Sequence, residues 1–174
     1  MKNQIIKRLL IRSIVLSAFS AIALFAAGVA RGQTTSVFAD GLSQPTKITQ
    51  TPLGNLLVTE TLGPPNSGRI SIIERDGSRR TLVDGLPSGI SAEGPSGPAG
   101  IEMRGRTLFV SIGEGDGVLP GPVPGTQVPN PNPASPLLSS VLVIHFSAKV
   151  ERFAQNFSLS FADQMTIANG GTVT

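Results

Sequence analysis

The sequence predicts an all-β fold. Beyond residue 32, apolar and polar residues alternate with a period of two in short runs, and Gly and Pro separate these runs. Helical periodicity appears only near the C-terminus. The passage Phe-Ala-Asp-Gly-Leu at 38–42 recurs as Leu-Val-Asp-Gly-Leu at 82–86. These observations predict short strands arranged in a repeated unit.

The strands are predicted from their alternation and from the turn residues around them. The strongest local signal is a hairpin over 70–83, where Asp76-Gly77 lies between two strand-like runs and favours a tight turn. Asp76 is therefore interpreted as a turn residue and not as an acid catalyst. The predicted strands are 36–39, 46–50, 56–60, 69–74, 79–83, 100–103, 107–112 and 141–146.

The repeated passages each precede a similar order of segments. Residues 55–60 correspond to 107–112 as second strands, and 69–73 correspond to 141–144 as third strands. A four-stranded unit that repeats every 40–50 residues or so is typical of a β-propeller blade. The sequence thus predicts a partial propeller of about two to three four-stranded blades. A β-sandwich is the alternative, because it also has short strands with regular turns.

The first 32 residues have the pattern of a helical signal peptide. A basic segment is followed by an apolar stretch over 13–30 and then by small residues suited to cleavage. We expect an exported protein, periplasmic or extracellular, that meets the membrane only through this peptide before cleavage. The alternative is an uncleaved anchor, because the apolar stretch approaches the length of a membrane span.

Composition excludes several classes of function. The chain has no Cys and one His, His145, so thiolate chemistry and His-rich metal sites are excluded. The first 32 residues contain five of the bases and no acid, which leaves the remainder mildly acidic. This remainder lacks the clustered bases and aromatics of a nucleic-acid-binding surface. His145 is interpreted as a packed strand residue.

Three irregular segments are predicted to share one face of the propeller: 61–68, 86–99 and 113–136. The third contains half of the chain's 14 prolines and forms a Pro-rich insertion at 117–136 within an incomplete propeller domain at 33–174. We expect it to be extended, polyproline-like chain. It is either a mobile surface insertion or a rim that shapes a binding site.

Three carboxylates are candidate metal ligands, because the predicted topology places them at or just after second strands on the loop-bearing face. They are Glu60, Glu114 and Asp116. Carboxylate oxygens suit hard cations such as Ca²⁺. The alternative is that they are solvated turn acids. No nucleophile elbow, phosphate-binding loop or dinucleotide fingerprint is present, so no catalytic residue is predicted and the cofactor is unknown.

Several runs resemble successive motifs of one protein family. VFADGLSQPTKIT, SAEGPSGPAG, SIGEGDGVLPGPVPGTQVPNPNPASPL and FADQMTIANGGTVT are similar to the ScyD/ScyE family, secreted propeller-like proteins associated with gene clusters for the pigment scytonemin. The resemblance covers 36–174. It implies a propeller fold and a role on the envelope side of pigment biosynthesis, and it supplies no catalytic residues. Family members are longer, complete propellers, which implies that this chain is a truncated member.

Together these features predict an exported, non-catalytic accessory protein that presents loops to a small-molecule or protein partner. The alternative is a metal-dependent propeller hydrolase or sugar dehydrogenase-like enzyme. A third interpretation is a non-functional fragment of either.

Overall fold

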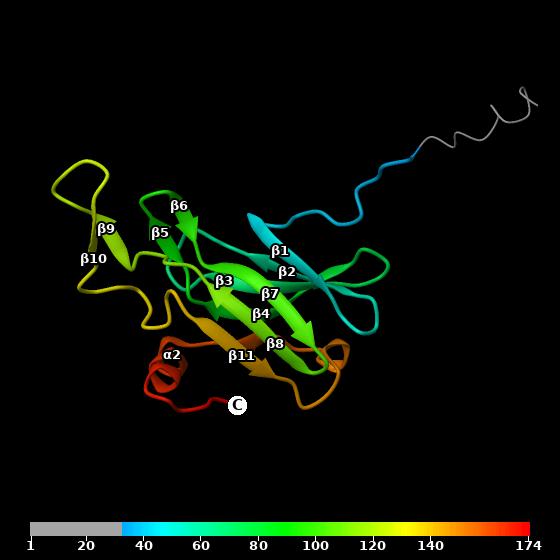
Figure 1. Ribbon diagram of the computed structural model, residues 1–174. Coiled ribbons are helices and arrows are strands. Elements are labelled where there is room, and N and C mark those ends of the chain that lie inside the picture. Colours follow the sequence, from blue (N-terminus) through cyan, green and yellow to red (C-terminus); the bar gives the residue numbers. More distant parts are fainter. Residues whose placement is uncertain (1–32) are drawn as a thin grey trace, which may run out of the picture. The chain divides into compact units, whose positions relative to one another are not determined.

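Strands provide most of the regular structure in residues 33–174, the part of the chain that the computed structural model describes (Figure 1). The predicted signal peptide at 1–32 lies outside the described residues. Phe38–Thr174 form one compact unit. Among the described residues, no helix is both long and apolar enough to span a membrane. The prediction of an all-β fold is confirmed at this coarse level.

The first sheet is an antiparallel meander in chain order, extended at one edge by a parallel strand. Its order is β1-β2-β3-β4-β12. The β3–β4 turn lies at the predicted position: Gly77 has a φ of +86°, and its N–H donates to the Glu74 carbonyl at 3.0 Å, although Asp76 does not share the positive φ. The strands are β1 (Pro45–Gln50), β2 (Leu56–Glu60), β3 (Gly68–Ile73), β4 (Arg79–Leu86) and β12 (Phe157–Ser158).

The second sheet has three antiparallel strands in the order β11-β8-β7. They are β7 (Pro98–Arg104), β8 (Thr107–Ile112) and β11 (Val141–His145). A tight turn at Gly105, with φ +62°, joins β7 to β8. In chain order β2 and β8 are each the second strand of their sheet, and β3 and β11 are each the third.

The two sheets share one apolar core. Thr46 on β1 and Thr61 after β2 both donate to the Pro98 carbonyl, at 2.6 and 3.1 Å, which fixes β7 beside the first sheet. In β8 the period-two alternation turns Leu108, Val110 and Ile112 towards this core, whereas β2 and β3 are buried at nearly every position. Core residues come from both sheets and include Leu57, Ile70, Ile72, Leu82, Val83, Leu86, Leu108, Val110, Ile112 and Leu142. None of the sheets is closed.

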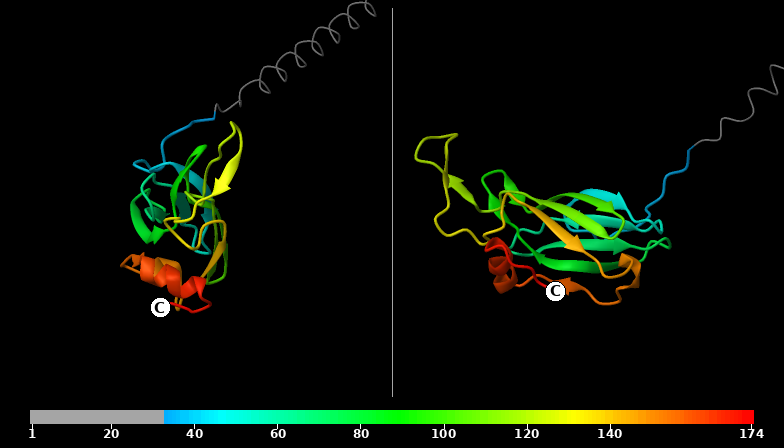
Figure 2. Two further views of the ribbon diagram at one scale, coloured as in Figure 1. Left: turned by 90° about the vertical axis from the view of Figure 1, so that its left-hand side faces the viewer. Right: turned by 60° about the horizontal axis from the view of Figure 1, so that its bottom comes forward.

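The predicted strand at 36–39 is wrong, because residues 33–44 form no strand. A suitable sequence forms a strand only where a partner supplies the hydrogen bonds, and no described strand pairs with this segment. The Pro-rich insertion at 117–136, expected to be extended, polyproline-like chain, is extended over two short segments that pair with each other. β9 (Val118–Pro120) pairs with β10 (Gln127–Pro129), and the hairpin projects from the two sheets (Figures 1 and 2). A smaller hairpin, β5 (Gly89–Ser91) with β6 (Gly94–Ser96), was not predicted.

The C-terminal segment covers the outer edge of the first sheet. It contains a 3₁₀ turn, η2 (Val150–Arg152), then β12 and the helix α2 (Phe161–Ala168). Ser160 and Asp163 form a capping box that starts α2. Gln164 of α2 is buried and donates to the Gly85 carbonyl of β4 at 3.0 Å. The pairing of β12 with β4 and the hydrogen bond from Gln164 to Gly85 therefore both connect β4 to residues more than 70 positions later in the chain.

Candidate functional site: a polar pocket framed by three loops

The structure brings together the three irregular segments that the sequence places on one face. Asn66, from the first segment, donates its backbone N–H to the Ser88 carbonyl at 3.0 Å and its side-chain amide to the Ala134 carbonyl at 2.8 Å. Ser88 and Ala134 belong to the second and third segments. One residue thus joins all three. Its positive φ of +53° suits Asn, which tolerates this conformation better than most residues do.

Ser88 strengthens this junction from a fully buried position. Its Oγ accepts the backbone N–H groups of Ser67 at 2.8 Å and Gly68 at 3.0 Å, and it donates to the Pro64 carbonyl at 3.0 Å. These bonds satisfy backbone groups that a buried loop would otherwise leave unpaired. The first and second segments are therefore held as one rigid rim.

Glycines let the second and third segments pack backbone against backbone. The Gly113 N–H donates to the Gly97 carbonyl at 2.7 Å. A Cβ at Gly113 would lie 2.5 Å from Ser96 Oγ and 3.3 Å from the Gly97 carbonyl oxygen, closer than side chains pack. The glycine-rich runs around 91–100 and 113–117 thus serve contact between loops.

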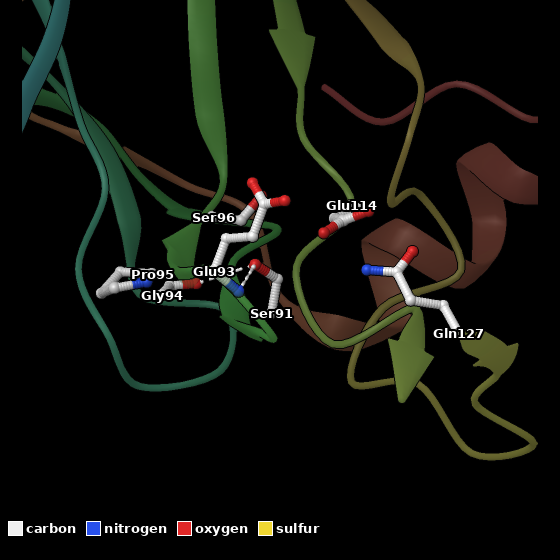
Figure 3. A pocket seen from close by; sticks show the side chains of 7 residues that line it. All are labelled: Ser91, Glu93, Gly94, Pro95, Ser96, Glu114 and Gln127. Carbon is white, nitrogen blue, oxygen red and sulfur yellow. Dashed lines mark hydrogen bonds between the residues drawn. The ribbon is translucent and has the colours of Figure 1, made fainter. Parts of the chain in front are cut away.

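A polar depression of about 470 Å³ lies where the second and third segments meet (Figure 3). The β5–β6 hairpin supplies most of its lining, and the loop after β8 and the β10 strand supply the remainder. In Figure 3, Glu114 is seen between the β5–β6 residues and Gln127. The lining residues are Ser91, Glu93, Gly94, Pro95, Ser96, Glu114 and Gln127.

The hydroxyls of this pocket are partly committed to its own backbone. Ser91 Oγ donates to the Gly94 carbonyl at 3.0 Å and accepts the Glu93 N–H at 3.2 Å. Ser96 Oγ accepts the Gly115 N–H at 3.1 Å. The carboxylates of Glu93 and Glu114 therefore dominate the lining, and they favour a ligand that carries positive charge or several hydrogen-bond donors.

Asp116, a predicted metal ligand, holds the third loop in place. Both of its carboxylate oxygens accept the Ala134 N–H, at 3.0 and 3.1 Å, and the side-chain amide of Asn130 donates to its backbone carbonyl at 2.7 Å. This carboxylate closes the base of the insertion that carries β9 and β10. Asp116 therefore accepts hydrogen bonds that hold this loop in its conformation.

Glu60, also a predicted metal ligand, is fully buried and ion-paired. Its Oε2 lies 2.7 Å from Arg69 Nη2, and its Oε1 lies 3.4 Å from Arg79 Nη1. The Ser43 N–H donates to Oε2 at 2.6 Å, and the Ser71 hydroxyl donates to Oε1. Glu60 thus ties β2, β3 and β4 to the chain that precedes β1.

Burial acts to raise the pKa of Glu60, but the hydrogen bonds from Arg69, the Ser43 N–H and Ser71, with the charge of Arg69, outweigh it. The pKa therefore lies below its ordinary value of 4.5. Since a carboxyl with a lowered folded pKa stabilises the fold above its unfolded pKa, this stabilisation is lost as the pH falls below about 4.5 and through the folded pKa.

We therefore expect the stability difference between the wild type and Glu60→Gln to depend on pH. The free energy of unfolding, measured by urea denaturation with far-UV circular dichroism, should differ most near pH 7 and converge as the pH falls below about 4.5. A difference that stays constant down to pH 3 or so would contradict this assignment.

The three predicted ligands are not assembled into one metal site. Among residues 33–174, no group of three or more His, Cys, Asp or Glu side chains is placed to hold a metal ion. Of the three carboxylates, only Glu114 lines the pocket. Ca²⁺ binding remains a prediction from the sequence alone.

Sequence reasoning missed most of the residues that build the pocket and its rim. Asn66 and Ser88 carried no local signal, because their importance lies in contacts with distant segments. Glu93 stands in the glycine-rich run singled out from the sequence, and its acidic neighbour across the pocket, Glu114, was already a candidate. Gln127 was hidden within the Pro-rich insertion.

Comparison with known proteins adds no relative. No protein-family model, no curated protein and no solved structure matches this chain.

Proposed function

We propose that the protein is an exported, non-catalytic accessory protein that binds a small polar ligand on its loop-bearing face. The observation that carries this proposal is the convergence of three loops, joined through Asn66, beside a pocket of about 470 Å³. Loops held by a rigid scaffold are the usual place for binding residues. A protein partner that presents the same chemistry would use the same face.

The fold proposed for this function is part of a β-propeller. Two meanders in chain order, with their first strands β1 and β7 close together, support it. The signal-peptide pattern at 1–32 supports export. The resemblance to the ScyD/ScyE family is the reason for linking the protein to envelope-side handling of a scytonemin-type pigment.

The lining suggests the class of ligand. Glu93 and Glu114 are acceptors with negative charge, and the Gln127 amide offers both a donor and an acceptor. An amine, a guanidinium group or a set of sugar hydroxyls would satisfy these groups. The metal-dependent alternative gains no specific support, because Glu60 and Asp116 are already engaged by arginines and by a backbone amide.

We expect a guanidinium compound such as agmatine to bind the purified full-length chain, and Glu114→Gln to weaken this binding by about tenfold or more. The reason is that a hydrogen bond to a charged group contributes about 1.5 kcal/mol or more. Isothermal titration calorimetry measures the affinity, and glucose serves as the neutral, hydroxyl-rich probe.

Glu102→Gln is the matched control, because Glu102 is an exposed carboxylate on β7 that does not line the pocket. It should leave the affinity unchanged. If neither probe binds the wild type at millimolar concentration, or if both variants weaken binding equally, the proposed site is wrong.

A further inference from the structure

The outer edge of β11 is an unpaired strand edge in the part of the chain that the structure describes. β11 ends the order β11-β8-β7. On the side facing β8, the Ile112 N–H donates to the Ser140 carbonyl and the Phe146 N–H donates to the Arg106 carbonyl. Since antiparallel pairing alternates, the N–H and C=O groups of Val141, Val143 and His145 point away from β8.

This edge lacks the features that normally protect one. Residues 139–147 contain no Asp, Glu, Lys or Arg and no proline. Val141 and Val143 are 62% and 49% exposed. The first sheet differs, because β12 pairs with the outer side of β4. Thus the fourth strand of the first sheet has a further pairing partner, whereas β11 of the second sheet has none among the described residues.

The chain contains a strand-like segment that occupies no sheet. Residues 36–42 belong to no strand, and none of the hydrogen bonds between described residues involves them. Gly41 has a φ of +68°, the same value as Gly85 at the corresponding position of β4. Val37 and Phe38 are 81% and 53% exposed. Ser43, at the end of this segment, is held by Glu60 and can act as a hinge. Moving residues 36–42 therefore breaks no hydrogen bond between described residues, but it gives up the packing of Phe38 against Gly77 and of Gly41 against Arg79.

The sequence of this segment matches the strand that the second sheet lacks. Phe38–Leu42 corresponds to 82–86, which lies in β4, the fourth strand of the first sheet. In the second sheet the third position is filled by β11 and the fourth is empty. By this sequence correspondence, the segment is the counterpart of β4, and β11 is the counterpart of β3, the strand beside which β4 pairs.

The correspondence also gives a register. In the first sheet Thr59 pairs with Ile70, and Ile70 pairs with Val83 at a point where the β3–β4 register shifts on both sides. Thr59 corresponds to Ser111, whose partner on β11 is Val141. Val83 corresponds to Ala39. Ala39 is therefore expected opposite Val141.

We propose that residues 36–42 of one copy of this chain add to β11 of a second copy as an antiparallel fourth strand. Reciprocal exchange makes a two-fold symmetric dimer in which both open edges are paired. Main-chain hydrogen bonds supply the attraction, and Val37, Phe38, Val141 and Val143 lose exposed apolar surface. The pocket lined by Glu114 takes no part in this pairing. Failure of the dimer proposal would therefore leave the proposed ligand site untouched, and the reverse also holds.

The first test is the mass of the purified full-length chain by size-exclusion chromatography with light scattering. The wild type should have the mass of two chains. Val143→Pro removes an N–H that points away from β8, so the β8–β11 pairing remains while the added strand loses a donor. We expect its dimer dissociation constant to rise about tenfold or more. Val143→Thr is the matched control, because it keeps the N–H and the β-branched shape, and it should remain dimeric.

The second test fixes the partner segment. The chain has no native Cys, so two single variants, Ala39→Cys and Val141→Cys, can be mixed and oxidised. They should cross-link to each other, whereas Ala39→Cys mixed with Ile48→Cys, whose residue on β1 is similarly exposed, should not. A monomeric wild type overturns the proposal. So does a dimer in which Val141→Cys links to itself but not to Ala39→Cys, because β11 would then pair with β11.

Discussion

Replacing Glu60 with alanine is expected to lower the free energy of unfolding by about 3 kcal/mol, because it removes one partner of a buried ion pair. The Glu60 side chain is inaccessible to solvent, while Arg69 and Arg79 remain 23% and 29% exposed. The exposed part of each arginine can be hydrated, which keeps the loss near the lower end for such pairs. The Ser43 N–H and the Ser71 hydroxyl also lose their acceptor.

Urea denaturation followed by far-UV circular dichroism measures this loss, since the chain has no Trp or Tyr for fluorescence. Glu102→Ala is the control. Glu102 pairs with Arg104 at 2.8 Å, but both side chains are mostly exposed, and such pairs contribute little. The control should lose no more than about 0.5 kcal/mol. Equal losses in the two variants would show that Glu60 does not organise the first sheet.

Replacing Gly85 with alanine should cost about 3 kcal/mol and release the C-terminal segment from β4. Gly85 has a φ of +68°, which is strained for alanine. The added Cβ would also meet the backbone carbonyl of Leu159 well inside van der Waals contact. Leu159 donates its N–H to the Asp84 carbonyl at 3.0 Å, so a shift here breaks the contacts that hold β12.

Gly105→Ala separates strain from steric conflict. Gly105 has a similar φ of +62°, but nothing lies within 4 Å of its added Cβ. It should therefore lose only the conformational part, about 1 kcal/mol. Hydrogen exchange at the Leu159 amide provides a second measurement: Gly85→Ala should speed this exchange and Gly105→Ala should not. Comparable losses of stability with unchanged Leu159 exchange would disprove the clash.

Local sequence signals located the central strands well. The bounds of β2 and β8 agree with the predicted 56–60 and 107–112, because a short run of apolar residues and flanking turn residues mark both strands. The sequence also predicted the position of the turn at Asp76-Gly77, since this turn requires a positive φ that glycine adopts readily. The segment 36–39 has the same kind of run but forms no strand. Such a run reports suitability for a sheet, and only a neighbouring strand supplies the hydrogen bonds.

In the candidate site, too, the sequence predicted which residues are of interest but not which residues they contact. The sequence identified the three loops and the acids Glu60, Glu114 and Asp116, but it could not assign their partners. Glu60 stands opposite Arg69 only because β2 and β3 pair in one register, which turns a candidate metal ligand into a structural ion pair. Asp116 accepts the Ala134 N–H only because the insertion folds back on itself.

The sequence alone therefore determined the strand-rich character of residues 33–174, the main turns and the positions of the long loops, because each depends on residues close together in the chain. Tertiary structure decided which acids are engaged, which residue joins the loops and which strand edge stays open. Those properties depend on contacts such as Asn66 with Ala134 and Gln164 with Gly85. Residues so far apart in the chain meet only after the sheets have packed, so no local pattern encodes them.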